Sequence, residues 1–372
     1  MTHAAHNLDR MFRPRSIAVV GASRHPAKLG AIVYRNIRSG GFRGQMFAVN
    51  IKGGTLDGHR VFQRVLDLPS AVDLAVIVTP ATVVPGILEE CGTKGIGNVV
   101  VISAGFREVG SEGKERELLL QEIIVRYSIN LLGPNCLGFA IGDSRLNASF
   151  GSPLAQGGSL GLISQSGAMA VALTDWAEKQ GIGIRTVISM GNKAGLTEIE
   201  LLRYVARDPE TQLIVLYLES MERGQEFLAL AKRVVRRKPI VVLKAGESPA
   251  SSKAVHFHTG ALAGDTEILN AALRQACVHQ AHSLRDLDRL VVSLQSARVP
   301  QSNRIAIITN AGGPGILAMD AMSHTTLRRA ALSQNTKDQL HEVLPAAASL
   351  ANPIDIIGDA EPKRFALAVK CV

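Results

Sequence analysis

An α/β fold with parallel sheets is predicted by three features of this 372-residue sequence. Short aliphatic runs recur along the chain, and each leads through a Gly-, Ser- or Asn-containing turn into a helix-compatible stretch. Hydrophobic residues make up 46% and aromatic residues only 4%, with 35 glycines, which is typical of Val/Ile/Ala strands joined to helices by tight turns. Because single domains usually span about 100–200 residues, two or three domains are expected.

Three strand–turn–helix openings divide the chain. The runs SIAVVGASR, SLGLISQSG and RIAIITNAGG begin at Ser16, Ser159 and Arg304. Each is typical of a buried parallel strand that ends in a tight turn. Their spacing of roughly 145 residues is too long for a solenoid repeat, so three separate α/β units are predicted.

Further strand-like runs follow each opening. In the first unit they lie at residues 46–50, 73–81, 98–106 and 129–138, with helical stretches at 85–95 and 114–127. In the second unit they lie at 185–192, 213–220 and 239–246. This βαβ alternation predicts parallel sheets with right-handed crossovers. The third unit has only one more such run, at 352–359, so an incomplete domain is expected there.

Charge and composition exclude several function classes. The formal net charge of +9 is compatible with nucleic acid, anionic membrane or a phosphorylated ligand. The densest basic stretch, KRVVRRK at 232–238, alternates charged with apolar residues as a solvated helix face does, and few aromatic residues offer base stacking. Nucleic acid is therefore not expected as a partner.

Redox and targeting signals are also few. Four widely spaced cysteines with no CxxC pair argue against a metal site or a disulfide scaffold. No run reaches the ~18 apolar residues of a membrane span, and the N-terminus lacks the apolar core of a secretory signal. We therefore expect no membrane association and a cytoplasmic location.

Ligands of open parallel sheets bind beyond the carboxyl ends of the strands. The first such turn, GASRHPAKLG at 21–30, offers a Gly and nearby cations, but it is not GxGxxG. No acid for an adenosine ribose follows about 20 residues later; Lys52 stands at the next strand end instead, which suits a phosphate better. The stretch fits either a phosphate loop or a tight βα turn with solvated cations.

Two further stretches have a functional and a plain structural interpretation. SQSGAMA at 164–170 opens a helix whose free N–H groups favour an anion, or it is an ordinary helix N-cap. AVHFHTGALAG at 254–264 places His256 and His258 before a Thr-Gly turn. By itself this stretch is typical of a histidine that caps a helix, and it does not choose between the two histidines.

Together these motifs resemble the NDP-forming acyl-CoA synthetases, the superfamily that includes the α subunit of succinyl-CoA synthetase. The most similar branch is the ADP-forming acetate–CoA ligases. The matching motifs run from about Phe12 to the chain end, in the family's order: VVGASRHPAKLG, VNIKGG, VTPA, SAGF, LGPNCLG, SQSGAMA, MGNKAG, LYLES, HTGALAG, TNAGGPG and NPIDIIGDA.

The resemblance implies a Rossmann-like CoA-binding domain followed by flavodoxin-like domains. The first would span residues 1–146. A flavodoxin-like, succinyl-CoA-synthetase-like domain with the phosphohistidine loop would span 147–298. An incomplete second flavodoxin-like domain would span 299–372.

It also implies chemistry and site residues. The family interconverts acyl-CoA, ADP and phosphate with free acid, CoA and ATP through an acyl phosphate and a phosphohistidine. The phosphohistidine carries over to His258, its carboxylate partner to Glu219, and the phosphate cradle to Ser164, Gln165, Ser166 and Gly167. The CoA-binding residues implied are Gly21, Ser23, Arg24, Lys28, Lys52, Thr79, Pro80, Ser103, Asn135 and Cys136, with Cys136 lining the pocket and not acting as a nucleophile.

The residue types suit these roles. A neutral imidazole is nucleophilic near neutral pH and is a good leaving group. A strand-end carboxylate such as Glu219 can accept the N–H of the other ring nitrogen and hold the tautomer. His256 is expected to be a bystander.

Cofactors and partners follow from the same resemblance. Coenzyme A would bind here, with a small carboxylic acid, whereas ATP or ADP and Mg²⁺ would reach the site only through an ATP-grasp β subunit or domain, since no such sequence is present. An oligomer is expected. The alternative is a non-catalytic CoA- or acyl-CoA-binding regulatory module, which the absent ATP-grasp sequence favours and the retained HTGALAG disfavours.

Overall fold

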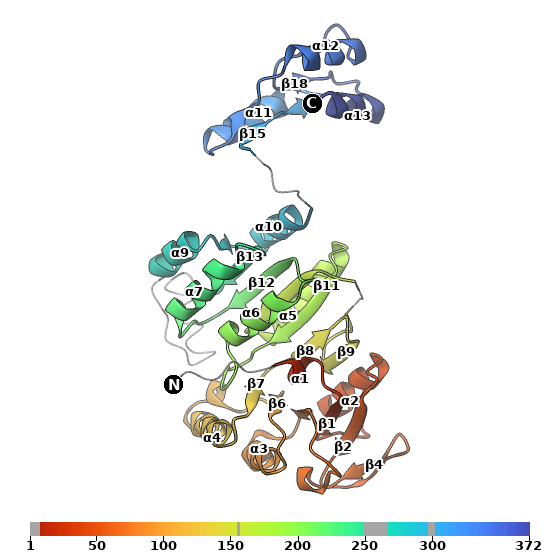
Figure 1. Ribbon diagram of the computed structural model, residues 1–372, viewed down its shortest axis with the longest axis vertical. Helices are drawn as coiled ribbons and strands as arrows, with labels where there is room; N and C mark the ends of the chain where they lie inside the picture. Colours follow the sequence, from red (N-terminus) through yellow and green to blue (C-terminus); the bar gives the residue numbers. More distant parts are fainter. Residues whose placement is uncertain (1–7, 155–156, 247, 249–250, 252–265, 297–301) are drawn as a thin grey trace. The chain divides into compact units, whose positions relative to one another are not determined.

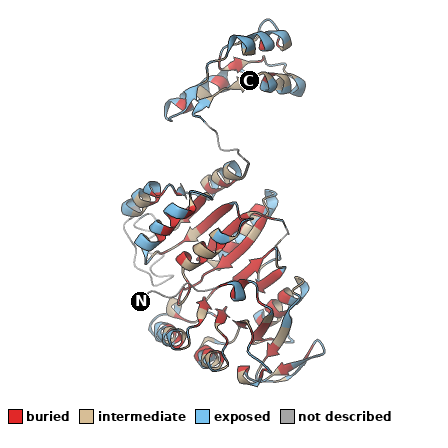
Figure 2. Ribbon diagram, in the orientation of Figure 1, coloured by how far each residue is buried: buried red, intermediate tan, exposed pale blue. Residues whose placement is uncertain are grey.

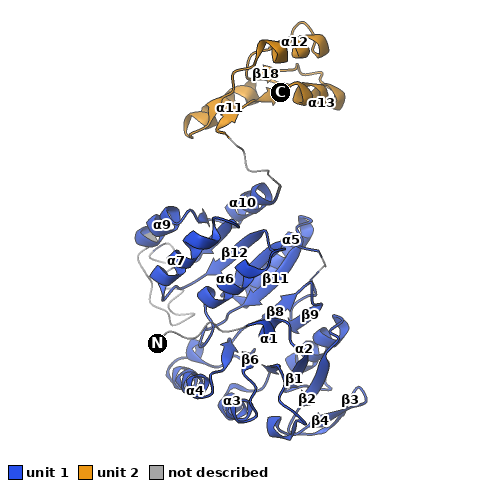
Figure 3. Ribbon diagram, in the orientation of Figure 1, with its two compact units in different colours: residues 1–296 blue, residues 297–372 orange. Residues whose placement is uncertain are grey.

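The computed structural model describes residues 8–154, 157–246, 248, 251, 266–296 and 302–372. Two units separate by their internal contacts, residues 1–296 and residues 297–372 (Figure 3). The first holds two seven-stranded, mostly parallel sheets. The predicted α/β class is therefore confirmed.

The first sheet has the strand order β3-β4-β2-β1-β5-β6-β7. Its strands are β1 (Ser16–Val20), β2 (Gln45–Val49), β3 (Gly54–Leu56), β4 (His59–Phe62), β5 (Leu74–Ile77), β6 (Asn98–Val101) and β7 (Asn130–Leu132). All neighbours pair in parallel except β3 and β4, which form an antiparallel hairpin at one edge. β1 lies between β2 and β5, so the direction of winding reverses there. This is the position at which open α/β sheets bind ligands.

The second sheet has the order β14-β13-β12-β10-β11-β8-β9. Its strands are β8 (Gly138–Ile141), β9 (Leu146–Ser149), β10 (Leu160–Ser164), β11 (Ile184–Ser189), β12 (Leu213–Leu218), β13 (Ile240–Lys244) and β14 (His279–Ala281). The parallel strands wind outward from β10, toward β11 on one side and β12 on the other. The reversal point of this sheet therefore lies between β10 and β12.

Residues 138–149 form an antiparallel hairpin that pairs with β11 of the second sheet. The sequence analysis treated its first residue as the end of a preceding strand and missed the hairpin, because each strand is only four residues long and buried throughout. The predicted division after residue 146 lies within this hairpin and stays a prediction.

Helices cover both faces of each sheet (Figure 1). They are α1 (Asp9–Phe12), α2 (Leu29–Ser39), α3 (Val84–Thr93), α4 (Ser111–Tyr127), α5 (Gly167–Lys179), α6 (Glu198–Arg207), α7 (Gly224–Val234), α9 (Thr266–Gln275) and α10 (Leu284–Ser296). α3 and α4 share one buried cluster with the first sheet, and α1 and α2 pack on its other face. In the second sheet, α5 and α10 cover one face and α6 and α7 the other. Figure 2 shows the resulting pattern of buried strands with helices exposed on their outer sides.

One hydrophobic cluster extends across both sheets of the first unit. Phe12, fully buried on α1, packs edge-on against Phe139 of β8 with ring centroids 4.9 Å apart, and lies 4.6 Å from the ring of Tyr204 on α6. Asn36 of α2 donates its amide to the carbonyls of Ser149 and Gly151. These contacts join the two sheets into one body.

Residues 302–372 are a smaller α/β unit. It contains β15 (Arg304–Ile305), β16 (Ile308–Thr309), α11 (Gly312–Ser323), β17 (Arg328–Arg329), α12 (Gln334–Val343), β18 (Ile354–Asp355) and α13 (Pro362–Cys371). β15 pairs in parallel with β17, and β16 pairs in parallel with β18. Its own core comprises Leu340, Leu344, Ile354, Ile356 and Ala368.

In the part of the chain that the structure describes, no helix has both the length and the apolar character needed to cross a bilayer.

Candidate functional site

The reversal point of the second sheet brings two of the predicted site segments together. Ser164, the last residue of β10, is in register with Tyr217 of β12. Gln165 directly follows β10 and Glu219 directly follows β12, so both leave the sheet at its carboxyl edge. The structure therefore brings Glu219 beside the SQSG segment.

Gln165 binds the backbone of the Glu219 segment. Its Oε1 accepts the N–H groups of Glu219 at 2.9 Å and Ser220 at 3.0 Å, and its Nε2 donates to Ser220 Oγ at 2.9 Å. Gln165 and Ser220 are both buried. These contacts of the Gln165 amide hold the Glu219–Ser220 backbone and are not directed at solvent.

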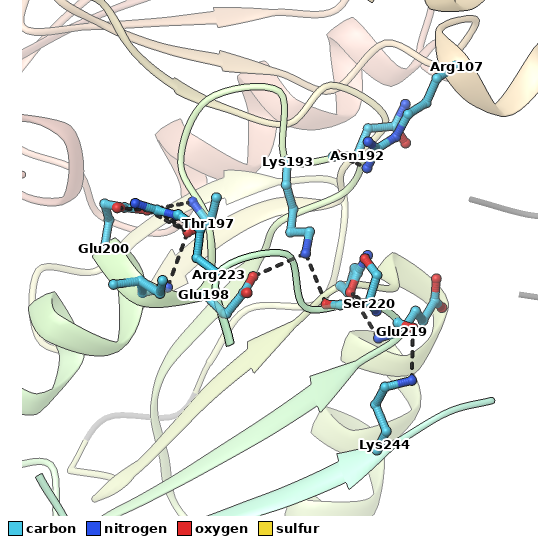
Figure 4. A network of polar contacts seen from close by, with 12 residues as sticks. Arg107, Asn192, Lys193, Thr197, Glu198, Glu200, Glu219, Ser220, Arg223 and Lys244 are labelled. Atoms are coloured by element: carbon cyan, nitrogen blue, oxygen red, sulfur yellow. Dashed lines mark hydrogen bonds and ion pairs between the residues drawn. The ribbon is translucent and has the colours of Figure 1, made fainter. Parts of the chain in front are cut away.

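A buried ion pair supports the same segment from the other side. Lys193 Nζ lies 3.1 Å from Glu198 Oε2 and donates to the Ser220 carbonyl at 3.0 Å, and both charged side chains are 2% exposed (Figure 4). Lys193 follows β11 with φ of 60°, in the left-handed region. A buried charge is tolerated when it is paired and hydrogen-bonded, as this ammonium is.

Lys244 completes the contacts at Glu219. Its Nζ donates to the Glu219 carbonyl at 2.9 Å from the end of β13 (Figure 4). Burial, together with the neighbouring Glu219 carboxylate, raises the pKa of Tyr217 to about 12. The phenol therefore stays protonated beside Glu219 at neutral pH.

The start of α5 offers two donors for an anion. Ser166 is its N-cap and accepts the Met169 N–H with Oγ at 3.3 Å, while Ser164 Oγ donates to the Ser166 carbonyl at 2.6 Å. The side chains of both serines are thus used within the turn. The first helical turn leaves the N–H groups of Gly167 and Ala168 without intrahelical acceptors. Ser166 is therefore an N-cap, and the anion site at this helix start stays a prediction.

A second polar network joins the two sheets at Asn192. Asn192 Nδ2 donates to Glu108 Oε2 at 2.6 Å and Glu117 Oε2 at 2.8 Å, and its Oδ1 accepts from Asn135 Nδ2 at 3.3 Å. Arg107 lies 3.4 Å from Glu117 Oε1 and also donates to the Asn192 carbonyl (Figure 4).

The two acids in this network titrate differently. Burial raises the pKa of Glu117, and its contacts with Asn192 and Arg107 offset this only in part. Burial acts on Glu108 too, but hydrogen bonds from Asn192 and from backbone N–H groups, including those of Gly105 and Phe106, outweigh it and lower the pKa. Glu108 is therefore the fixed negative charge that ties the SAGF turn to the second sheet.

The predicted CoA-binding residues gather at the carboxyl edge of the first sheet. Gly21, Ser23, Arg24 and Lys28 follow β1, Lys52 follows β2, Thr79 and Pro80 follow β5, Ser103 follows β6, and Asn135 and Cys136 follow β7. The Asn50 side chain holds the turn by donating to the Ala22 carbonyl at 2.8 Å and accepting the Lys52 N–H at 3.0 Å. Lys28 and Lys52 are exposed, whereas Arg24 Nε donates to the Thr55 carbonyl at 2.7 Å.

A glycine pair shapes this turn. Gly21 has φ of 96°, and a Cβ on Gly30 would lie 2.0 Å from the Gly21 carbonyl oxygen. α2 therefore approaches the end of β1 closely, which is the role of the last Gly in dinucleotide-binding turns. The sequence analysis found no paired glycines here; the Gly at the end of GASRHPAKLG was the available signal.

Four of the predicted residues line the turns after the central strands: Thr79, Ser103, Asn135 and Cys136. Ser103 Oγ donates to the Thr79 carbonyl at 2.5 Å, and Ser103 accepts the Asn135 N–H at 2.9 Å. Thr79 Oγ1 is buried and has no protein partner. Cys136 Sγ is buried against the Val101 carbonyl, and burial raises the pKa of the thiol to about 12. A thiol held protonated is a poor nucleophile.

The predicted phosphoryl carrier, His258, and its neighbour His256 lie outside the described residues.

Two known protein families match the parts of the chain that contain the two large sheets. A family described as "CoA binding domain" matches residues 15–142, and one described as "Succinyl-CoA ligase like flavodoxin domain" matches residues 157–294. The α subunit of acetate–CoA ligase [ADP-forming] I from Pyrococcus furiosus is 39% identical over 98% of this chain and 79% of that protein.

The chain belongs to the ADP-forming acetate–CoA ligase family.

Other relatives are longer. Acetate–CoA ligase [ADP-forming] I of Archaeoglobus fulgidus is 42% identical over 98% of this chain but only 52% of its own length. The chain thus spans about half the length of such relatives. The structure of acetyl-coenzyme A synthetase 1 from Ca. Korarchaeum cryptofilum, in complex with phosphate and ADP, matches with a TM-score of 0.93 and 36% identity, covering 98% of this chain and 79% of that one. Within the acetate–CoA ligase family, this chain therefore corresponds to the α-subunit part.

The sequence analysis gave no role to several residues of the two polar networks around Lys193 and Asn192. Asn192 and Lys193 appeared only within the motif MGNKAG and Ser220 only within LYLES, whereas Glu108 and Glu198 were not singled out. Asn192 and Glu108 are 84 residues apart, and Lys193 and Ser220 are 27 residues apart, so the sequence carries no local signal for these contacts.

Proposed function

We propose that this chain is the CoA-binding, phosphoryl-carrying part of an ADP-forming acyl-CoA synthetase. Phosphate displaces CoA from an acyl-CoA and yields an acyl phosphate and the free thiol. The His258 imidazole then takes the phosphoryl group and releases the carboxylic acid. Phosphohistidine finally passes the group to ADP, which forms ATP and regenerates the imidazole.

The observation that carries this proposal is the position of Glu219 beside the α5 N-terminus, at the reversal point of the second sheet. A carboxylate there can hold the imidazole tautomer and stabilise the positive charge that develops on the ring. The N–H groups of Gly167 and Ala168 can bind the phosphoryl oxygens without competing as nucleophiles.

Coenzyme A is assigned to the reversal point of the first sheet. Exposed Lys28 and Lys52 supply counter-charges for its phosphates, with the backbone at Gly21 and Ser23 as donors. The buried, partnerless Thr79 Oγ1 and the neighbouring Ser103 and Asn135 lie where the pantetheine arm would enter. ADP and Mg²⁺ are expected on an ATP-grasp subunit or domain, in a cytoplasmic oligomer that uses a small carboxylic acid.

The test needs no partner protein. The full chain is incubated with acetyl-CoA and [³²P]phosphate, and the label is followed through acid and base treatment. We expect a base-stable, acid-labile label that disappears in His258→Ala and persists in the matched control His256→Ala. An unchanged label in His258→Ala contradicts the proposal.

The same protein distinguishes the proposed enzyme from the alternative, a non-catalytic CoA-binding regulatory module. If calorimetry shows CoA binding but no acyl-CoA supports labelling, the result favours a regulatory CoA-binding module. The same calorimetry on Lys28→Ala and Lys52→Ala should show weaker CoA binding, because each removes a counter-charge from the proposed phosphate site.

A further inference from the structure

The Glu219–Ser220 segment is bound by side chains at every backbone polar group. Both N–H groups donate to Gln165 Oε1, the Glu219 carbonyl accepts from Lys244, and the Ser220 carbonyl accepts from Lys193. Ser220 Oγ also accepts from Gln165 Nε2. Gln165 directly follows β10, Lys193 lies in the turn after β11, and Lys244 is the last residue of β13.

These side-chain contacts replace the strand partners that the backbone loses after β12, and they carry a desolvation cost. The chain has left the sheet after β12, so this segment no longer finds partners in a neighbouring strand, and buried groups without partners are unfavourable. A water-exposed turn would meet that need with solvent. Here a lysine is buried instead, together with Glu198 that neutralises it, although each buried charge carries a desolvation penalty.

We propose that Lys193, paired with Glu198, is a positioning residue that acts with Gln165 to hold the Glu219 backbone, and through it the Glu219 carboxylate, in the orientation that the phosphoryl-transfer step requires. This inference rests on the proposed function for the role of Glu219. Lys193 itself touches no reacting atom in this scheme. Its effect passes through the Ser220 carbonyl to the adjoining peptide.

The test variant removes both charges at once. Lys193→Met alone leaves a buried carboxylate unpaired and can fail to fold, whereas the double variant Lys193→Met/Glu198→Met leaves no unpaired buried charge. The matched control is Arg223→Met. Arg223 lies three residues beyond Ser220 and pairs with Glu200 at 2.6 Å. Its other side-chain hydrogen bonds go to Thr197 and Glu226, not to Glu219 or Ser220. CoA affinity, which depends on the first sheet, serves as the folding check.

Amide hydrogen exchange measures how firmly the Glu219–Ser220 backbone is held, and it does not depend on whether the chain is active. In the double variant we expect the Glu219 and Ser220 amides to exchange at least about tenfold faster than in the wild type, because local opening becomes easier. Arg223→Met should leave them unchanged. Unaltered exchange of these two amides in a folded double variant overturns the proposal.

A mutant cycle tests whether this positioning affects the rate of phosphoryl transfer. Single-turnover labelling from acetyl-CoA and [³²P]phosphate should be at least about tenfold slower in the double variant and in Glu219→Gln. The triple variant should be no slower than Glu219→Gln alone, because Lys193 acts through Glu219. Multiplied effects in the triple variant, or full activity in the double variant, overturn the proposal.

Failure of the proposed function gives a different pattern. If the wild-type chain takes no label from any acyl-CoA, the proposed function fails, while the exchange measurement still decides whether Lys193 and Glu198 hold this segment.

Discussion

At the scale of the single residue, the Gln165 side chain makes protein contacts that the sequence did not predict. Sequence analysis placed it among the phosphate-binding residues because it lies in SQSG. In the structure its backbone N–H donates to the Tyr217 carbonyl and its amide holds Glu219 and Ser220. A phosphate at this turn would therefore be bound by Gly167 and by Ala168, which was not predicted. Whether an anion binds there stays a prediction.

Cysteine reactivity gives a test at the same level. Burial raises the pKa of both Cys91 and Cys136 to about 12, so neither forms appreciable thiolate at pH 8. We expect iodoacetamide at pH 8 to alkylate exposed Cys277 in the native chain at least about tenfold faster than either buried cysteine, as measured by peptide mass spectrometry. In urea all three should react alike. Rapid native alkylation of Cys136 contradicts its assignment as a protected pocket residue.

At the scale of the elements, α2 can approach β1 closely because Gly30 has no side chain. A Cβ at Gly30 would lie 2.0 Å from the Gly21 carbonyl oxygen, which is backbone and cannot move aside alone. We expect Gly30→Ala to destabilise the chain by about 1–3 kcal/mol in urea unfolding and to weaken CoA binding in calorimetry.

Gly86 is the matched control for this substitution. It lies exposed on α3, and a Cβ there would have no atom within 4 Å. Gly86→Ala should be neutral or stabilise the helix by about 0.5–1 kcal/mol. Equal destabilisation by the two substitutions contradicts the close-packing explanation for Gly30.

The start of α6 makes stability depend on pH. Thr197 caps the helix, and Glu200 accepts its N–H and hydroxyl while pairing with Arg223. Burial acts against ionisation, but these contacts outweigh it and lower the pKa of Glu200 below its usual 4.5. The resulting stability is present above the unfolded pKa and is lost as pH falls through the lower folded value.

Glu200→Gln should therefore cost about 1 kcal/mol at pH 7 and lose less stability than the wild type between about pH 5 and pH 3. Urea unfolding across this range measures the difference. Glu115→Gln, on the exposed face of α4, should follow the wild-type profile. Parallel profiles for Glu200→Gln and the wild type contradict the assigned role.

The predicted strands in both large sheets were largely confirmed, because buried parallel strands are continuous apolar runs. The hairpins β3–β4 and β8–β9 escaped prediction. Their strands have three or four residues, too few to establish a strand period.

In the whole molecule, the first two sheets share one core. Phe12 inserts between Phe139 and Tyr204, and Asn192 binds Glu108 and Glu117 from the other sheet. The contacts give two units, residues 1–296 and 297–372, whereas the family matches separate residues 15–142 from 157–294. The predicted three-domain division stays a prediction.

A truncation tests this organisation. Because residues 297–372 have a separate core, we expect a 1–296 fragment to unfold in one cooperative transition and to bind CoA within about threefold of the full chain. Differential scanning calorimetry and CoA titration measure both. Two transitions in the fragment, at the two sheets' separate melting points, contradict a shared core.

The order of amino acids alone specified the α/β class, most of the parallel strands and the two strand-end edges where ligands are expected. These follow from local patterns, since a buried strand and the turn after it are written in consecutive residues. The buried Lys193–Glu198 pair, the use of Gln165 to hold Glu219, and the bridge at Asn192 depended on the folded chain. Each joins residues from separate strands or helices, and an ion pair is favourable in the interior only when folding brings its partner and its remaining acceptors to it.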